Sequence, residues 1–134
     1  MRRSTPLLLA LAACLALAAP ARAFDINALR ARYKLPPLAE SATLAGAAYA
    51  HARDMAARRH LDHRGFRERV AALHAVAAEN VAYGCPDAAC AFRMWSRSPG
   101  HRRNMLMRGV THYGLASAMA ADGRRYWVLE LGSE

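Results

Sequence analysis

The stretch that decides the fold covers residues 95–106 and reads WSRSPGHRRNML. Within it, Ser98 stands directly before Pro99. This order is typical of the first residues of a helix, because serine can cap an open helix end and proline needs no amide donor there. We therefore expect a short helix that starts at Pro99 and carries His101. Trp95 ends the preceding helix, on an apolar face that should pack against the core.

Upstream of this stretch, apolar residues recur at three- and four-residue steps, which indicates amphipathic helices. The Pro36-Pro37 pair breaks the first helix, since proline removes an amide donor. Ser41 and Asp87 are suitable caps for the second and the fourth. The expected helices cover residues 24–34, 41–60, 66–77 and 87–95. Residues 79–84 are expected to lead out of the third helix.

Downstream of the decisive stretch, the pattern changes from helices to strands. Residues 113–119 have strand character, and residues 126–131 read YWVLEL, with the β-branched and aromatic side chains that strands favour. Asp122-Gly123 between them is a strong signal for a hairpin turn. Helices come first and a terminal hairpin follows, so the expected fold class is α+β.

The first 23 residues have the features of a signal peptide. Two arginines stand near its start, an apolar run covers residues 7–19, and Ala21-Arg22-Ala23 fits the small-x-small pattern of signal peptidase. The apolar run is shorter than the roughly 20 residues that span a bilayer. The expected location is therefore secreted or periplasmic. The alternative is a lipoprotein anchored through Cys14, because residues 11–14 resemble a lipobox.

The chain has 134 residues, enough for one domain, and a net charge of +9. Removal of the signal peptide would leave a single domain, residues 24–134, with a charge of +6. We expect such a basic exported domain to meet an anionic surface, an envelope polysaccharide or lipid, and no nucleic acid. No transmembrane helix is expected after cleavage of the signal peptide.

Cys85 and Cys90 are the cysteines of the mature chain. Export would place them in an oxidising compartment, where an even number of cysteines indicates a disulfide. A metal site is the alternative, but two thiolates without a second pair of ligands form a poor one. The bond would close a small loop, so we expect a modest stabilisation and a fixed entry to the next helix.

Six histidines occur in the chain. His51 lies within the long helix, and His74 and His112 have no acidic or histidine neighbour at a useful spacing. We expect these three to be structural. His60 and His63 form a His-x-x-His pair, which is a poor metal site by itself. The sequence shows no nucleophile constellation and no glycine-rich phosphate loop.

Several segments of the chain together resemble a known family. They are HRG at 63–65, AENVAYG at 78–84, the WSRSPGHRRNML stretch at 95–106, Gly114, and YWV at 126–128. Their order and spacing resemble the CAP superfamily of cysteine-rich secretory, antigen 5 and pathogenesis-related proteins. The compact bacterial SCP-like branch is the most similar. The resemblance covers about residues 25–132, and residues 98–106 are its most specific part.

The resemblance implies an α-β-α sandwich with a small antiparallel sheet between helices. It also implies a cleft in which His63, Glu79 and His101 converge from three separate segments. Two imidazoles and one carboxylate can bind Zn²⁺ and leave an open position for water. The same groups can instead form a hydrogen-bonded cluster that holds the cleft together. The other motif residues are expected to be structural: Asn80, Trp95, Ser98, Asn104 and Trp127.

The chain departs from the family pattern at two positions. Ala78 replaces a glycine, and Ser98 stands where eukaryotic members have a second glutamate, so a site that needs two carboxylates is weakened. The expected function is binding of a divalent metal or a small ligand at the cell envelope. Two alternatives stay open: a metal-dependent hydrolase of envelope peptide or glycan, and a lipid-binding or interaction module without catalysis.

Overall fold

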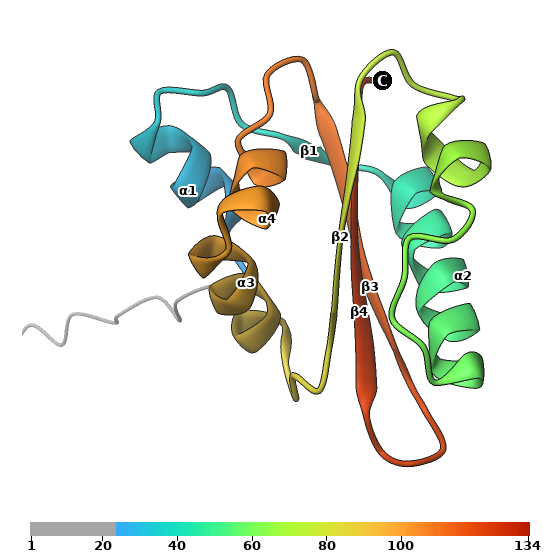
Figure 1. Ribbon diagram of the computed structural model, residues 1–134. Helices are drawn as coiled ribbons and strands as arrows, with labels where there is room; N and C mark the ends of the chain where they lie inside the picture. Colours follow the sequence, from blue (N-terminus) through green and yellow to red (C-terminus); the bar gives the residue numbers. More distant parts are fainter. Residues whose placement is uncertain (1–23) are drawn as a thin grey trace, which may run out of the picture.

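The computed structural model describes residues 24–134, and the expected signal peptide with Cys14 lies outside them. A four-stranded sheet lies between α2 on one side and α1, α3 and α4 on the other (Figure 1). The expected α+β sandwich is confirmed. In chain order the elements are α1 (Ile26–Arg32), β1 (Ala39–Glu40), α2 (Ala42–Arg58), the π-helix η1 (Arg67–Ala71), β2 (Ala77–Tyr83), α3 (Ala88–Arg97), α4 (Pro99–Met105), β3 (His112–Met119) and β4 (Arg125–Gly132).

The sheet has the strand order β1-β3-β4-β2, so β2 forms one edge. β4 pairs antiparallel with both β2 and β3, while the short strand β1 runs parallel to β3. The register places Glu79 of β2 opposite Glu130 of β4, and Val81 opposite Val128. Side chains alternate between the two faces of a strand. These four side chains therefore point to the same face of the sheet, the one that α2 covers.

Helix α2 lies directly on the sheet. It begins where the side chain of Ser41 accepts a hydrogen bond from the backbone amide of Leu44 at 3.2 Å. Met55 and the alanines that precede it on the same face of the helix are fully buried. A Cβ atom on Gly114 of β3 would stand 2.1 Å from the backbone nitrogen of Ala45. Only glycine therefore allows the helix to approach β3 so closely.

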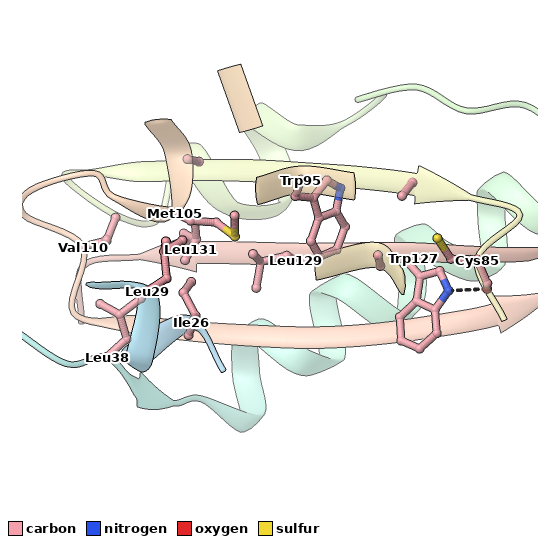
Figure 2. Packing of buried hydrophobic residues seen from close by; sticks show 13 residues of the cluster. Ile26, Leu29, Leu38, Cys85, Trp95, Met105, Val110, Trp127, Leu129 and Leu131 are labelled. Carbon is pink, nitrogen blue, oxygen red and sulfur yellow. Dashed lines mark hydrogen bonds between the residues drawn. The ribbon is translucent and has the colours of Figure 1, made fainter. Parts of the chain in front are cut away.

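The opposite face of the sheet carries the larger apolar core, which Figure 2 shows from close by. Trp95 of α3 is fully buried, and its Nε1 donates to the carbonyl of Val81 at 3.0 Å. Trp127 of β4 donates from Nε1 to the carbonyl of Cys85 at 2.9 Å, the dashed line in Figure 2. Cys85 forms the expected disulfide with Cys90 at the entry to α3, with the two Cα atoms 5.4 Å apart.

Residues 66–77 do not form the expected helix. Only Arg67–Ala71 are helical, as a single π-helical turn, and Leu73, which was expected to face the core, is 69% exposed. The chain then enters β2, which contains most of the segment expected to lead out of that helix. Both faces of β2 are covered by helices, so its side chains do not alternate between apolar and polar. The pattern that normally indicates a strand is therefore missing.

The helix ends follow the expected caps, with one exception. Ser41 and Asp87 accept hydrogen bonds from amides of the helices that they cap. Ser98 takes the N-cap position of α4, before Pro99, but its side chain makes no capping hydrogen bond. The prediction is correct for the position and wrong for the bond. No helix within residues 24–134 is long and apolar enough to cross a membrane.

Candidate functional site

Glu79 is the centre of the candidate site. It lies on the edge strand β2, and its side chain is buried. Nδ1 of His63 donates a hydrogen bond to Oε1 of Glu79 at 2.6 Å, and the guanidinium of Arg69 donates one to Oε2. Nε2 of His51 lies 3.8 Å from the same Oε1. Residues from α2, from the loop after it and from η1 therefore surround this carboxylate.

A second carboxyl group, that of Glu130 on β4, lies beside Glu79 in the sheet and is completely buried. Arg69 bridges the two groups: its Nε donates to Oε1 of Glu130 at 3.0 Å while its Nη2 holds Glu79. Oε2 of Glu130 has no hydrogen-bond partner within residues 24–134. The guanidinium of Arg69 thus donates hydrogen bonds to two buried carboxyl groups.

The two carboxyl groups differ in their pKa. Burial raises the pKa of Glu130 to about 9, and the neighbouring Glu79 adds to the shift. Burial also acts to raise the pKa of Glu79, but the hydrogen bond from His63 and the charge of Arg69 outweigh it. The pKa of Glu79 therefore lies below its ordinary value. At neutral pH Glu130 is protonated and Glu79 is ionised, which leaves Arg69 a single negative charge to balance.

The loop after α2 is held in position by hydrogen bonds on both sides of His63. The carbonyl of Asp62 accepts a hydrogen bond from Nε2 of His51 at 2.8 Å, and its carboxylate accepts one from the amide of Arg64 at 3.2 Å. Nη1 of Arg69 donates to the carbonyl of Arg64 at 2.8 Å. The residues before and after His63 are therefore tied to α2 and η1, which fixes the direction of the imidazole.

The two candidate imidazoles have opposite pKa shifts. The hydrogen bond to Glu79 raises the pKa of His63, whose side chain is 52% exposed. Burial lowers the pKa of His101 on α4, and the charge of His63 lowers it further. His63 contacts Glu79 and the carbonyl of His101 contacts Asn80, so the two residues reach neighbouring positions of β2 from opposite sides of the sheet. Nδ1 of His101 is buried and has no hydrogen-bond partner in the described part of the chain.

The outer edge of β2 connects the site to α4. Nδ2 of Asn104 donates to the carbonyl of Glu79 at 3.2 Å and to Oδ1 of Asn80 at 2.9 Å. Nδ2 of Asn80 donates in turn to the carbonyl of His101 at 3.0 Å. An edge strand leaves backbone groups without strand partners, and side-chain donors can satisfy them. These two amides therefore fix the position of His101 relative to Glu79.

Three other histidines lie apart from this cluster. The side chain of His60 is largely exposed. Nδ1 of His74 hydrogen-bonds the carbonyl of Ser133 at 2.9 Å, and Nε2 of His112 lies 3.9 Å from a carboxylate oxygen of Glu134. Because these histidines have neighbours of their own, they serve as controls for the candidate residues.

Sequence reasoning missed three parts of the site. His51 was expected to be a structural helix residue, but it is buried beside Glu79. Glu130 was expected only as a strand residue. An acid within the apolar run at 126–132 nevertheless indicates a buried polar contact, since a buried acid needs a partner. Arg69 carried no local signal, because its partner Glu130 lies 61 positions further along the chain.

The described side chains do not form a ready metal centre. Within residues 24–134, no group of three or more His, Cys, Asp or Glu side chains is arranged to hold a metal ion. Both oxygens of Glu79 have partners, and the charged guanidinium of Arg69 would repel a cation beside it. The arrangement therefore does not fit Zn²⁺ on His63, Glu79 and His101 unless Glu79 first leaves Arg69.

Comparison with known proteins agrees with the fold and with the motifs. The model of the cysteine-rich secretory protein family, CAP, matches residues 24–131. The chain therefore belongs to the cysteine-rich secretory protein family. No curated protein matches the chain at a significant level.

Solved structures of bacterial proteins have the same fold. An outer surface protein of Borrelia burgdorferi has a TM-score of 0.72 at 21% identity, over 81% of this chain and 86% of that chain. An extracellular protein of Bacillus anthracis that contains an SCP domain has a TM-score of 0.68 at 27% identity, over 81% of this chain and 38% of that chain. A cysteine-rich secretory protein of Staphylococcus aureus has a TM-score of 0.63 at 21% identity, over 81% of this chain and 36% of that chain. This chain thus spans little more than a third of the last two proteins.

Proposed function

We propose that this is an exported CAP-domain protein that binds a small ligand of the cell envelope in the cleft formed by His63, Glu79 and His101. Residues 1–23 would be removed as a signal peptide, and residues 24–134 would be secreted or periplasmic. This location is supported by the structural relatives, which are named as extracellular, secretory or outer-surface proteins. A lipid anchor on Cys14 is the alternative means of retention at the envelope.

The observation that carries the proposal is a pair of imidazoles with open ring nitrogens. Glu79 engages Nδ1 of His63, but Nε2 of the same ring has no hydrogen-bond partner within residues 24–134. His101 makes no side-chain hydrogen bond there, and its Nδ1 is buried. A buried polar atom without a partner costs free energy unless a ligand or water satisfies it. His63 and His101 reach neighbouring positions of β2, so their open ring nitrogens are suited to bind the oxygen atoms of one small molecule.

The charges of the site favour an anionic or hydroxylated ligand. Arg69 and ionised Glu79 neutralise each other, and Glu130 is protonated at neutral pH. His63 is therefore the group that adds a positive charge as the pH falls, and its Nε2 then becomes a donor. Its donor can bind a carboxylate, phosphate or sugar oxygen, while neutral His101 can accept or donate.

Calorimetry with acidic peptidoglycan fragments tests this function. We expect the domain to bind them and expect His63→Ala and His101→Ala to abolish binding. The matched controls His60→Ala and His74→Ala remove imidazoles that lie outside the cluster, so they should bind like the unchanged protein. Equal weak binding by all five proteins would contradict the proposal, because it would indicate adventitious contacts with surface histidines.

A second candidate is metal-dependent hydrolysis of envelope peptide or glycan. The contact of His63 with Glu79 and the partnerless ring nitrogen of His101 favour it, because imidazole and carboxylate are ligands that Zn²⁺ takes in catalytic sites. Zn²⁺ would then be held by the two imidazoles and Glu79, and it would activate a water for attack. Glu79 would have to release Arg69 before it could contribute a ligand.

Titration of Zn²⁺ into the same five proteins separates the two candidates. Tight binding of Zn²⁺ with turnover of the fragments, both lost in His63→Ala and His101→Ala, would support the hydrolase. Binding of Zn²⁺ without turnover would support a metal-dependent binding protein. Equal weak binding of Zn²⁺ in all five proteins would exclude a metal-dependent function and leave metal-free ligand binding.

A further inference from the structure

The net charge of the domain is confined to one of its two sides. Residues 24–38 and 85–111, which form α1, α3, α4 and their connections, contain eight basic and two acidic residues. The rest of residues 24–134, which forms the sheet, α2 and η1, contains eight basic and eight acidic residues. The whole charge of +6 therefore belongs to the layer of α1, α3 and α4 (Figure 1). A generally high arginine content would not produce this asymmetry.

The two acids of this layer are used as helix caps. Asp25 accepts a hydrogen bond from the amide of Ala28, and Asp87 from the amide of Cys90, both at 2.8 Å. Within residues 24–134, no basic residue of the layer forms an ion pair, whereas Arg58 and Arg69 on the other side do. The positive charges at the exposed positions of this layer are therefore available to an external partner.

A hollow of about 630 Å³ lies between the end of α1 and helix α4. Arg102, Arg103 and Arg108 line it, together with Tyr33 and Leu106, and no acidic residue is among its lining residues. Three arginines around an open hollow create a positive potential that attracts anions. Arginine is also well suited to phosphate, because its planar guanidinium can donate two parallel hydrogen bonds.

A second hollow, of about 320 Å³, continues the basic surface between α1 and α3. Arg32, Arg93 and Arg97 line it, and its one acidic lining residue is Asp25, the N-cap of α1. Arg32 lines this hollow and its neighbour in the chain, Tyr33, lines the first, so both hollows border the end of α1. We call the six arginines that line the two hollows the arginine face.

A buried arginine holds the backbone that carries this face. Arg30 is almost completely buried, and its Nη1 donates to the carbonyls of Met105 and Met107, each at 3.0 Å. These carbonyls belong to the end of α4 and to the segment that leads to Arg108. The guanidinium also has no carboxylate partner in the described chain, so it adds to the positive potential beneath the hollow.

Apolar side chains at the first hollow favour a lipid surface as the partner. Tyr33 is 52% exposed, and the partly buried Leu106 and Met107 lie among the arginines. Exposed aromatic and aliphatic groups beside basic ones suit the boundary between lipid headgroups and acyl chains. A polysaccharide would pair with the charges, but it has no acyl region for the aliphatic side chains.

We propose that the arginine face docks on an anionic lipid bilayer. Arg102, Arg103 and Arg108 contact the headgroup phosphates, and Tyr33 and Leu106 reach the acyl boundary. The contact is peripheral, and it leaves the cleft of His63, Glu79 and His101 to its own ligand. An exported domain would in this way be held at the membrane surface without a membrane-spanning segment.

Sedimentation of the domain, residues 24–134, with lipid vesicles tests the proposal. We expect binding to vesicles of phosphatidylglycerol and phosphatidylcholine, little binding to phosphatidylcholine alone, and weaker binding as salt is added. A basic residue near an anionic bilayer contributes about a fivefold factor in binding. The triple variant Arg102→Gln, Arg103→Gln, Arg108→Gln should therefore bind roughly a hundredfold more weakly.

A second triple variant controls for net charge. Arg53→Gln, Arg59→Gln and Arg67→Gln removes the same charge from exposed positions on the α2 side. We expect it to keep vesicle binding within about threefold of the unchanged domain, since these positions lie away from the bilayer. Equal losses in the two triple variants would overturn the proposal, because binding would then depend on net charge and not on this face.

Two further variants separate the lipid from its alternatives. Tyr33→Ser with Leu106→Ser should weaken binding to vesicles while leaving binding to the soluble polyanion dextran sulfate unchanged. Unchanged vesicle binding in this double variant would overturn the lipid proposal and favour an acidic polysaccharide. His63→Ala should bind vesicles normally, so failure of the cleft proposal and failure of this one would be distinguishable.

Discussion

The two faces of the sheet bury different kinds of side chain. Under α2, the sheet buries Glu79 and Glu130 together with the smaller of the two apolar clusters. Under α1, α3 and α4, it buries Trp95, Trp127 and a larger set of leucines and methionine (Figure 2). The disulfide between Cys85 and Cys90 closes that side. Burial of acids costs free energy, whereas burial of large apolar side chains supplies it.

The difference suggests a division of labour within one small domain. The apolar face provides most of the stability, and the polar face uses part of it to hold Glu79 beside His63. The outer surfaces show the reverse arrangement. The helices that cover the apolar face carry all of the net charge, and the rest of the domain carries none. Each prediction below changes one face and leaves the other intact.

The largest effect is expected from the apolar face. Trp95→Ala should lower the free energy of unfolding by about 3–5 kcal/mol, because it leaves a large cavity and removes the hydrogen bond to the carbonyl of Val81. Urea unfolding followed by circular dichroism measures this. The matched control is Met94→Ala on the same helix, which is 45% exposed and should cost less than about 1 kcal/mol. A similar small loss in both variants would contradict the division of labour.

A moderate effect is expected from the disulfide between Cys85 and Cys90. The bond closes a short loop, so replacing both cysteines by serine should cost about 2 kcal/mol. Thiol titration of the unreduced exported protein should find no free thiol. Two reactive thiols in freshly isolated protein would show that the bridge does not form during export.

A smaller effect is expected from the polar face at low pH. Below about pH 4.5 Glu130 is neutral in both the folded and the unfolded chain, so Glu130→Gln replaces one neutral group by another and should change stability there by less than about 1 kcal/mol. The pKa of Glu130 is about 9 in the folded protein and near 4.5 in the unfolded chain. The unfolded state therefore releases this proton first, and stability should fall as the pH rises from about 4.5 to about 9.

Unfolding at a series of pH values checks this dependence. The loss of stability across that window should be smaller in Glu130→Gln than in the unchanged protein. Glu68→Gln, at an exposed position of η1, should leave the dependence unchanged. An identical pH dependence in all three proteins would show that Glu130 is ionised in the fold.

The apolar face was largely predictable from the sequence. Helical periodicity indicated α1 and α3, the Ser98-Pro99 pair indicated the start of α4, and the Asp122-Gly123 turn indicated the hairpin of β3 and β4. These signals are local, since each depends on residues within a few positions of one another. The disulfide was predictable for the same reason, from two cysteines five positions apart in an exported chain.

The polar face was predictable only in part. The motif resemblance pointed to His63, Glu79 and His101, but β2 was missed because its alanine-rich sequence has no alternating pattern. The bridge from Arg69 to Glu130 was missed because it joins distant positions. Buried ion pairs depend on which residues the finished fold brings together, and no local rule encodes that choice.

The pKa of His101 tests the central claim, that His63 and His101 share one cleft, most directly. Nuclear magnetic resonance titration of the imidazole ring measures it in the unchanged domain, in His63→Gln and in the control His60→Gln. The account predicts a pKa below 6.5 in the unchanged domain, from burial and the charge of His63, and a higher pKa in His63→Gln. His60→Gln should change nothing. An identical pKa of His101 in all three proteins would contradict the shared cleft.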